Sequence, residues 1–325
     1  MPPQLVRADG QLHELILDQT FPLWHDGLSR AQYGHYNHAQ MRTAWGTRGL
    51  ARVALAEGDC VLASAKRYDL AAVFEGRPIR GIGIGAVFTP PDLRGRGYGR
   101  AIVSAMVDAA ARDGAGLAIL FSEIGTSYYE ALGFVPVPLA TSEVIVTGKS
   151  GAVGVPMRTA DDRDLPAIAE IHNASVERYR LGLRYDHDWI RYSVQKKRLL
   201  SVLGGAPHRD VEFFVAEEGG GPAAWVLLQV ERDEATPSAA ERWTLESCGD
   251  RDPSGARIGA LLQSLIARAP AAAAPAIRAW WPPELRPPQL ICRAHGASGI
   301  TMMVRPLGAA GIRLEPPIPA RDVLY

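Results

Sequence analysis

Several features that would point to particular protein classes are scarce or missing in this sequence. It has only three cysteines in 325 residues and no CxxC pair, so neither a disulfide framework nor a thiolate metal site is indicated. Charge of one sign is not in excess, because 35 Lys and Arg balance 35 Asp and Glu, and this balance argues against a nucleic-acid-binding protein. No stretch approaches the roughly 18 uninterrupted apolar residues of a membrane span, and the first residues contain no apolar run typical of a signal peptide. We therefore expect a reduced, cytoplasmic protein with no nucleic-acid partner and no membrane partner.

What is present is the composition of a globular protein with two domains. Hydrophobic residues make up 47% of the chain and charged residues 22%, which suits a sizeable core, and a length of 325 residues favours two domains over one. The two halves begin alike, because residues 7–9 (RAD) and 158–161 (RTAD) each precede leucines and isoleucines at helical spacing. A glycine-rich stretch over residues 147–155 separates the halves. We expect one domain over residues 1–147 and a second over residues 155–325.

Both halves show the same order of predicted elements. In the first half, apolar patterning predicts strands over residues 51–56, 61–74, 78–89, 117–121 and 134–146, with a helix after a glycine loop and a short helix over 127–132. In the second half a hairpin, a strand and a helix recur in that order. The pattern predicts an α/β (α+β) protein in which each domain holds a mixed, mostly antiparallel sheet flanked by helices.

The motif with the clearest chemistry is the glycine loop at residues 94–99, RGRGYG, between a predicted strand and a predicted helix. Gly97 and Gly99 have no Cβ, so their amides can approach a ligand without a clash. The free N–H groups and the dipole at the start of the helix favour an anion, and Arg94 and Arg96 add positive charge. The loop is neither a GxGxxG motif nor a P-loop. It predicts a site for a phosphate or pyrophosphate.

Two motifs together resemble those of the GNAT superfamily of acyl-CoA-dependent N-acetyltransferases. Arg94, Gly97 and Gly99 match its R-x-x-G-x-G/A pyrophosphate loop, and residues 129–134 resemble its Y-x-x-x-G-F segment. The resemblance implies tandem GNAT-like domains with acetyl-CoA as the cosubstrate and no metal. It implies that the main chain of Phe88 and Thr89 polarises the thioester carbonyl. The residues expected to bind acetyl-CoA are Phe88, Thr89, Arg94, Gly95, Arg96, Gly97, Tyr98, Gly99 and Arg100.

The resemblance also implies catalytic residues. Tyr129 matches the family's general acid, which donates a proton to the leaving thiolate, whereas Tyr128 suits a packing role. No acidic residue lies on the strand before the glycine loop, so Glu123 is the nearest candidate for the general base, although capping of the next short helix explains it equally well. The C-terminal carboxylate of Tyr325 is a further candidate for the base.

The acceptor amine is expected to meet the helical region that forms one wall of the site in this fold. His25, Tyr33 and His35 are the candidate acceptor-binding residues there. His25, His35 or His38 is an alternative base, because the pKa of a histidine suits that role near neutral pH. The glycines that alternate along residues 78–89 either admit the cofactor or acceptor closely or keep a flat face for packing.

The second half lacks an intact copy of the loop. At residues 249–256, GDRDPSGA, Ser254 replaces the key glycine and Pro253 removes an amide donor. Asp250 and Asp252 place negative charge where an anion would bind, and no Y-x-x-x-G-F segment follows. We expect a degenerate GNAT-like domain that binds no CoA and either has a structural role, completes the acceptor pocket or mediates dimers.

These observations predict an acetyl-CoA-dependent N-acetyltransferase that acts on a primary amine by direct attack in a ternary complex. The acceptor is expected to be a small molecule such as an amino acid, and the chain a monomer or homodimer. A W-x-x-G-L segment at residues 24–28, Tyr33 and the segment 120–125 also resemble fungal lysine N6-acetyltransferase-like proteins within the superfamily. The alternatives are a protein lysine or N-terminal acetyltransferase and a non-catalytic acyl-CoA-binding sensor.

Overall fold

The computed structural model of the chain divides into two compact units. It describes residues 2–137, 140–147, 155–204, 208–231, 241–268, 275, 277–282, 285–297, 299–308 and 323–324. The first unit comprises Met1–Leu139, Arg180–Leu183 and Gly299–Asp322, and the second comprises Ala140–Tyr179, Arg184–Ser298 and Val323–Tyr325. Neither unit is therefore one continuous segment of the sequence.

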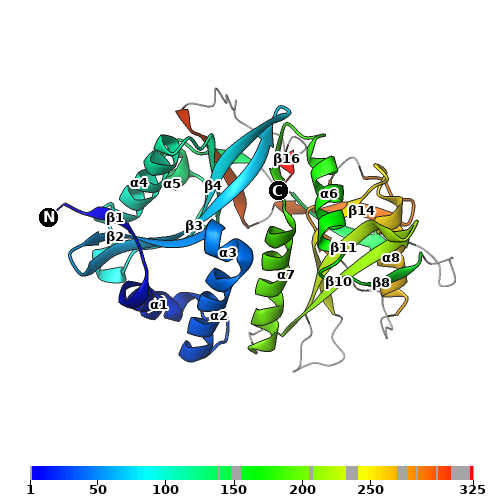
Figure 1. The fold of residues 1–325 in the computed structure, drawn as a ribbon, viewed down its shortest axis with the longest axis horizontal. Helices are drawn as coiled ribbons and strands as arrows, with labels where there is room; N and C mark the ends of the chain where they lie inside the picture. Colours follow the sequence, from blue (N-terminus) through cyan, green and yellow to red (C-terminus); the bar gives the residue numbers. More distant parts are fainter. Residues whose placement is uncertain are drawn as a thin grey trace. The chain divides into compact units, whose positions relative to one another are not determined.

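The first unit is a mixed sheet with helices on both faces (Figure 1). Its strands follow the order β1-β2-β3-β4-β5-β15-β6, with β9 beside β3, and neighbours along this order are antiparallel except β4 and β5. The strands are β1 (Gln4–Arg7), β2 (Leu50–Glu57), β3 (Cys60–Phe74), β4 (Arg77–Phe88), β5 (Leu117–Ser122), β6 (Val135–Val137), β9 (Leu181–Arg184) and β15 (Thr301–Pro306). The helices are α1 (Gly10–Trp24), α2 (Arg30–Arg42), α3 (Ala44–Gly49), α4 (Tyr98–Arg112) and α5 (Ser127–Glu130), with a 3₁₀ turn at Pro91–Leu93.

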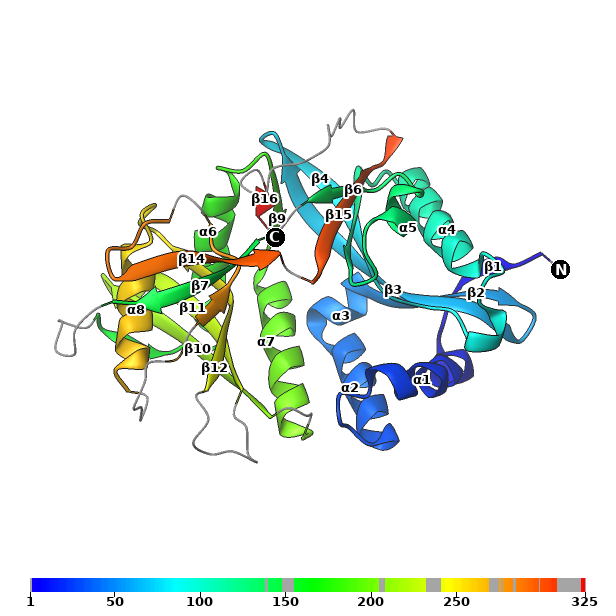
Figure 2. The same ribbon diagram turned by 180° about the vertical axis from the view of Figure 1, so that it is seen from behind.

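Different helices cover the two faces of this sheet (Figure 2). On one face, Val53 and Leu55 pack with Met106 of α4 in the main core cluster. On the other face, Ala54 packs against Ile16 of α1, because neighbouring strand residues point to opposite faces. The α4 helix forms as expected, since its apolar residues recur at helical spacing and are almost fully buried. These residues are Ile102, Val103, Met106, Val107 and Ala110.

The end of β4 diverges from β5. The parallel pairing of these strands runs from Gly81 to Ile84, whereas β4 continues to Phe88. Beyond Ile84, β4 contains a bulge relative to β3, because Lys66 pairs with Gly85 and Ser64 already pairs with Phe88. Ala86 lies in this bulge with a φ of 48°, in the left-handed region. The divergence leaves the last residues of β4 without pairing to β5.

The second unit repeats this plan. Its sheet has the order β14-β7-β13-β12-β11-β10-β8, in which β12 and β13 form the parallel pair. The strands are β7 (Ala140–Val146), β8 (Met157–Thr159), β10 (Arg209–Glu218), β11 (Gly221–Glu231), β12 (Arg242–Asp250), β13 (Ile277–Ala279) and β14 (Leu290–Ala297). The helices are α6 (Leu165–Val176), α7 (His187–Val202) and α8 (Ala256–Ile266), and β16 (Val323–Leu324) is the last described strand. The predicted class, two mixed and mostly antiparallel sheets flanked by helices, is confirmed.

Strands from the second half of the sequence complete the first sheet, and a strand from the first half lies in the second sheet. The predicted strand over residues 134–146 is two strands, of which β6 stays in the first sheet and β7 lies in the second, between β13 and β14. In the first sheet, β15 from residues 301–306 lies between β5 and β6. Met302, Met303 and Val304 of β15 are fully buried there. Each sheet is thus completed by a strand distant in sequence, and the expected boundary at residue 147 does not coincide with the division between the units.

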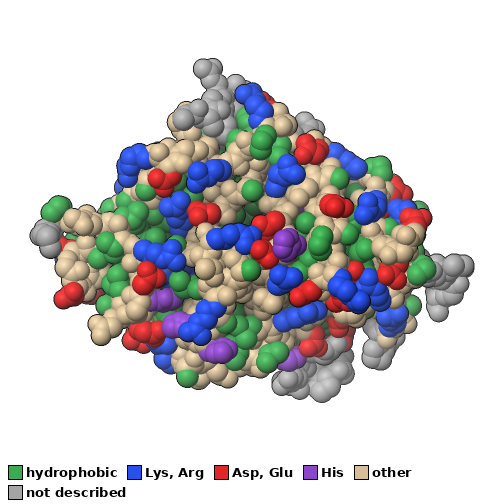
Figure 3. All heavy atoms as spheres, in the orientation of Figure 1, with side chains coloured by type: hydrophobic (Ala, Val, Ile, Leu, Met, Phe, Trp, Pro, Cys, Tyr) green, Lys and Arg blue, Asp and Glu red, His purple; other side chains and the backbone are tan. Residues whose placement is uncertain are grey.

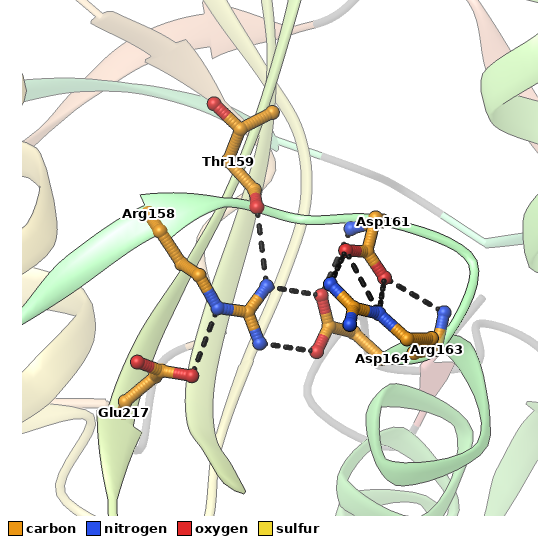
Figure 4. Close-up of polar contacts among 6 residues, drawn as sticks. All are labelled: Arg158, Thr159, Asp161, Arg163, Asp164 and Glu217. Atoms are coloured by element: carbon orange, nitrogen blue, oxygen red, sulfur yellow. Dashed lines mark hydrogen bonds and ion pairs between the residues drawn. The ribbon is translucent and has the colours of Figure 1, made fainter.

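The similar openings of the two halves, RAD at residues 7–9 and RTAD at residues 158–161, do form a strand, a turn and a helix in both units. In the second unit, both terminal nitrogens of Arg158 donate to the Asp164 carboxylate at 2.7 Å, and its Nε donates to Glu217 at 2.8 Å (Figure 4). These charge-assisted bonds raise the pKa of Arg158 and lower that of Asp164. Among the described residues, the corresponding Arg7 makes a side-chain bond only to the exposed Asp9. The shared turn is therefore braced much more firmly in the second unit.

Candidate functional site

The glycine loop lies between the end of β4 and the start of α4. Gly95 and Gly97 have φ values of 78° and 82°, and Gly97 is the residue that precedes the helix. A Cβ built on either residue meets nothing within 4 Å, so the left-handed backbone, and not crowding, explains these two glycines. No side chain caps the helix, and the first amides of a helix have no partner within the helix. The loop therefore presents free N–H groups at an open surface.

Three arginines surround this loop. Arg94 donates from Nε to the Thr89 carbonyl oxygen at 3.2 Å, and Arg96 donates from Nη2 to the Asp92 carbonyl oxygen at 3.3 Å. The first bond ties the loop to the residue that follows β4, and the second ties it to the 3₁₀ turn. Arg94, Arg96 and Arg100 all reach solvent, so their charges lie beside the helix terminus. Free amides and positive charge suit a pyrophosphate.

The first turn of α4 packs tightly against two hydroxyl groups. A Cβ built on Gly99 would lie 3.0 Å from Tyr128 Oη and 3.3 Å from Thr89 Oγ1. Gly99 thus differs from Gly95 and Gly97, because space and not backbone conformation requires glycine there. The position of the Tyr128 hydroxyl at this loop was not predicted from the sequence, which assigned Tyr128 to packing. The sequence alone does not distinguish the roles of the two adjacent tyrosines, since both lie in the same short helix.

Tyr129 lies in the core of the first unit. It is 8% exposed, and its ring contacts those of Tyr128 and Phe134 at centroid distances of 5.0 and 6.0 Å. Burial raises the pKa of Tyr129, and burial also raises that of Tyr128, with the nearby charge of Arg100 acting in the opposite direction. Both phenols therefore stay protonated at neutral pH.

At the end of β4, a ligand would meet backbone atoms and few side-chain atoms. Phe88 is 4% exposed and its ring contacts that of Trp24 at a centroid distance of 6.1 Å. Its side chain is thus committed to packing, and the role expected of its backbone stays a prediction. The left-handed Ala86 redirects the peptide groups just before it.

Glu123 follows β5 in a tight turn. The Ser122 hydroxyl closes this turn by donating to the Gly125 carbonyl oxygen at 2.5 Å. Glu123 is exposed, and the described residues give its carboxylate no hydrogen-bond or ionic partner. It does not cap α5, whose preceding residue makes no side-chain cap. Its role as the base stays a prediction, and Tyr325 lies outside the described residues.

The predicted acceptor residues differ in their surroundings. His25 ends α1, and its Nδ1 accepts a hydrogen bond from the Gly27 amide at 3.1 Å. Tyr33 is buried on α2, with its hydroxyl 3.1 Å from Thr20 Oγ1. Phe21 contacts both rings, at 5.3 and 5.7 Å, whereas His35 is exposed elsewhere on α2. The structure therefore brings His25 and Tyr33 together around Phe21 but shows no contact from either to His35 among the residues described.

The surface over α1 and α2 carries several histidines, and acidic and basic groups are interspersed on the face shown (Figure 3). His38, the other alternative base, pairs with Glu14 at 2.7 Å. The alternating glycines of β4 have a packing explanation. A Cβ on Gly83 or Gly85 would crowd Tyr68, and one on Gly81 would lie 2.7 Å from Leu117. These glycines accommodate side chains of the same unit.

The corresponding loop of the second unit is closed by its own carboxylate. Asp250 accepts hydrogen bonds from the amides of Asp252 and Arg257, both at 2.8 Å, so an acidic side chain occupies the start of α8. The Arg286 amide donates to the Ser254 carbonyl oxygen at 2.9 Å. A Cβ on Gly255 would meet Leu285 at 3.2 Å. This loop is thus covered and internally satisfied, unlike the open loop at Gly97.

Two further features concern the described part of the chain as a whole. None of its helices has the length and apolar character needed to cross a membrane. No group of three His, Cys, Asp or Glu side chains within it is arranged to hold a metal ion.

Comparison with known proteins finds a family model that matches part of the chain. Residues 17–137 match the model of the acetyltransferase (GNAT) domain. This match confirms the resemblance for the first half and the prediction of an acyltransferase at the level of the family. No curated protein matches the sequence. The fungal lysine N6-acetyltransferase-like assignment stays a prediction.

Solved structures share the fold over nearly the whole chain. A probable N-acyltransferase from Enterococcus faecalis, described as a conserved protein of unknown function, superposes with a TM-score of 0.66 at 12% identity, covering 94% of this chain and 73% of its own. A GCN5-related N-acetyltransferase from Kribbella flavida gives 0.61 at 18% identity, covering 94% and 72%. Saccharomyces cerevisiae N-myristoyltransferase with bound myristoyl-CoA gives 0.52 at 9% identity, covering 93% and 82%. At these identities the likeness concerns the fold.

Proposed function

We propose that the chain is an acetyl-CoA-dependent N-acetyltransferase that transfers an acetyl group to the primary amine of a small molecule. The observation that carries this proposal is the open, arginine-flanked glycine loop at the start of α4, next to the end of β4 that diverges from β5. The free amides of that helix terminus suit the pyrophosphate of CoA. The match of residues 17–137 to the GNAT domain supports the same substrate.

The first unit supplies the groups that the reaction needs. The main chain around the β4 bulge, close to Phe88 and Thr89, hydrogen-bonds the thioester carbonyl in this proposal as negative charge develops on its oxygen. The amine nitrogen attacks that carbonyl carbon, a C–N bond forms and the C–S bond breaks. Tyr129 donates a proton to the leaving thiolate, because burial raises its pKa and keeps the phenol protonated. The attacking amine loses its proton to Glu123 or to water.

We further propose that the second unit binds no CoA. Its loop holds the carboxylate of Asp250 against the start of α8, so negative charge already occupies the position of an anion. The unit has a structural role, because β7 pairs with β13 and β14 in its sheet.

Calorimetry and a thiol-release assay test the proposal together. We expect acetyl-CoA to bind with a stoichiometry of one per chain, and thiol release to require an amine from a panel of amino acids, polyamines and lysine peptides. Gly97→Asp is expected to abolish binding, since it adds a carboxylate and a strained left-handed residue at the pyrophosphate site. Asp113→Asn, at the exposed end of α4, is the control and should bind normally.

Each alternative has its own outcome in this assay. Release with peptides but with no free amine indicates a protein acetyltransferase. Tight binding with no release from any amine indicates an acyl-CoA sensor. Absence of acetyl-CoA binding, or binding that survives Gly97→Asp, contradicts the proposal.

A further inference from the structure

An arginine is buried in the first unit, and no acidic side chain in the described part of the chain pairs with it. Arg52, on β2, is 2% exposed. Within the described chain its guanidinium is hydrogen-bonded to Asn37 Oδ1 at 3.0 Å and to Tyr33. Its Nη1 atom is buried and has no hydrogen-bond partner there. Burying an arginine without an opposite charge is strongly unfavourable, so packing alone does not explain this residue.

Two other buried polar atoms near Arg52 also lack partners among the described residues. They are Nε2 of His13, on α1, and Oγ of Ser64, on β3. His13 is 6% exposed and Ser64 is fully buried. Burial chiefly lowers the pKa of His13 to about 4, and the charge of Arg52 is the next cause, so the guanidinium acts on this ring. Nη1 of Arg52, Nε2 of His13 and Oγ of Ser64 thus form one layer of buried polar atoms under α1 and α2, without hydrogen-bond partners among the described residues.

The strand register places this layer on one face of the sheet. Arg52 pairs with Lys66 and Ala54 pairs with Ser64, and directly paired residues share a face. Arg52 and Ser64 are therefore diagonal neighbours, with Cβ atoms about 7 Å apart. Ser64 in turn pairs with Phe88 at the end of β4. The layer thus extends from Arg52 to the end of β4, where the main chain is proposed to hold the thioester.

Among the described residues, no carboxylate is bonded to the guanidinium of Arg52. The acid whose charge acts on the neighbouring His13 is Glu14. Glu14 is already engaged, since it pairs with Arg30 at 2.9 Å and with His38 at 2.7 Å. The guanidinium of Arg52 therefore lacks a carboxylate, which is the group that it binds best.

We propose that Arg52 binds the carboxylate of the acceptor, so that the acceptors of this site are amines that carry a carboxylate group. The carboxylate accepts from Nη1 of Arg52, with His13 and Ser64 as further hydrogen-bond partners, while the amine reaches the thioester beside Phe88. Since Arg52 is 2% exposed, the carboxylate reaches it when α1 or α2 moves away from the sheet. This inference rests on the proposed acetyl transfer for the place of the amine, and on Arg52 for the carboxylate.

The first test compares matched acceptors on the unaltered protein. β-Alanine, L-lysine and L-phenylalanine are assayed for thiol release beside their carboxamides. Because a carboxamide lowers the pKa of a neighbouring amine, rates are compared per unprotonated amine. We expect kcat/KM to be about 10- to 100-fold higher for the acids, the range that a hydrogen bond to a charged group supports. Equal kcat/KM for acids and carboxamides overturns the proposal, whatever the variants do.

The second test uses variants. Arg52→Met removes the charge at similar length and is expected to abolish the preference for acids, chiefly through KM, while Arg52→Lys retains part of it. Arg42→Met, on α2, is the matched control and should leave the preference intact. A folded Arg52→Met protein that still prefers acids contradicts the proposal. If that variant does not fold, the comparison on the unaltered protein decides.

A binding measurement separates this inference from the proposed function. Calorimetry with the same acids and carboxamides, on the protein saturated with CoA, requires no acetyl transfer. Tighter binding of acids, lost in Arg52→Met, supports the carboxylate site even where no thiol is released, and in that case only the proposed function fails. Release from amines with no preference for acids in either assay supports the proposed function and refutes the role of Arg52.

Discussion

Gly99 has two hydroxyl groups within van der Waals reach of the Cβ that it lacks. We expect Gly99→Ala to weaken acetyl-CoA binding by about 5-fold, because the methyl group displaces Tyr128 Oη and Thr89 Oγ1 from the first turn of α4. Calorimetry with acetyl-CoA measures the loss. The double variant Gly99→Ala, Tyr128→Phe removes the nearer obstacle and is expected to recover most of the affinity. Equal affinity of Gly99→Ala and the unaltered protein would show that this turn does not contact CoA.

Tyr128 and Tyr129 are expected to differ in kinetic role. Tyr129→Phe should lower kcat about 100-fold, the usual contribution of a general acid, whereas Tyr128→Phe should chiefly raise the KM for acetyl-CoA. A general acid works only while protonated, and the pKa of Tyr129 is raised. The alkaline fall in kcat is therefore expected above about pH 10, the ordinary pKa of tyrosine, and should vanish in Tyr129→Phe. If Tyr128→Phe instead removes this fall, the proton comes from Tyr128.

His13 makes the stability of the first unit depend on pH. Burial lowers the pKa of this histidine from 6.5 to about 4, so the folded protein takes up the proton at a lower pH than the unfolded chain. The contribution of the neutral ring to stability is therefore complete above about pH 6.5 and falls as the pH drops from 6.5 to 4, by up to about 3 kcal/mol. Urea unfolding at a series of pH values measures this slope. His13→Gln should flatten it, and His35→Gln, at an exposed site, should not.

At the residue scale, the sequence alone predicted the features that depend on local chemistry. The glycine loop between a strand and a helix was predicted, because the left-handed conformation of Gly97 depends on its immediate neighbours. Arg52 was not recognised, because a single arginine in a strand normally points to solvent. Its burial depends on α1 and α2, which no local pattern reveals.

The β4 bulge lies at the end of the strand whose main chain is proposed to hold the thioester. Ala86 holds a left-handed conformation there, which disfavours any residue with a Cβ by about 1–2 kcal/mol. Ala86→Gly should leave the free energy of unfolding within about 0.5 kcal/mol, because the relief is offset by the greater freedom of glycine in the unfolded chain. Ala86→Val should lose about 2 kcal/mol, since a branched side chain tolerates this region less. Denaturant titration distinguishes these outcomes, and an Ala86→Val protein as stable as the unaltered one would mean that the bulge relaxes freely.

Helices and single strands were predicted well because their apolar periodicity is local. The α4 helix and β5 match their expected ranges closely. The strand over residues 134–146 was assigned to the wrong sheet in its second part, since alternating residues such as Val144 suit any sheet with an open position. The sheet in which β7 lies is set by its pairing with β13 and β14, and this pairing joins residues that are distant in sequence.

At the scale of the whole molecule, neither half of the sequence contains a complete sheet. We expect the fragment 1–147 to be insoluble when expressed alone, because it lacks β15 and leaves the edge of β5 unpaired. The fragment 148–325 should fail likewise without β7. Expressed together, the two fragments should form a 1:1 complex that binds acetyl-CoA. Size-exclusion chromatography and calorimetry check both results.

A matched variant isolates the contribution of the exchanged strand. Met303→Asp places a charge at a fully buried position of β15 and should prevent assembly of the fragments, whereas Arg305→Ala, at a half-buried position of the same strand, should permit it. A fragment 1–147 that is monomeric and folded alone would show that the first sheet closes without β15.

The strand exchange also bears on how such a chain can change over generations. Deletion of the second half would remove β15 from the sheet that carries the glycine loop. We therefore expect selection on the first unit to act on residues of the second half as well.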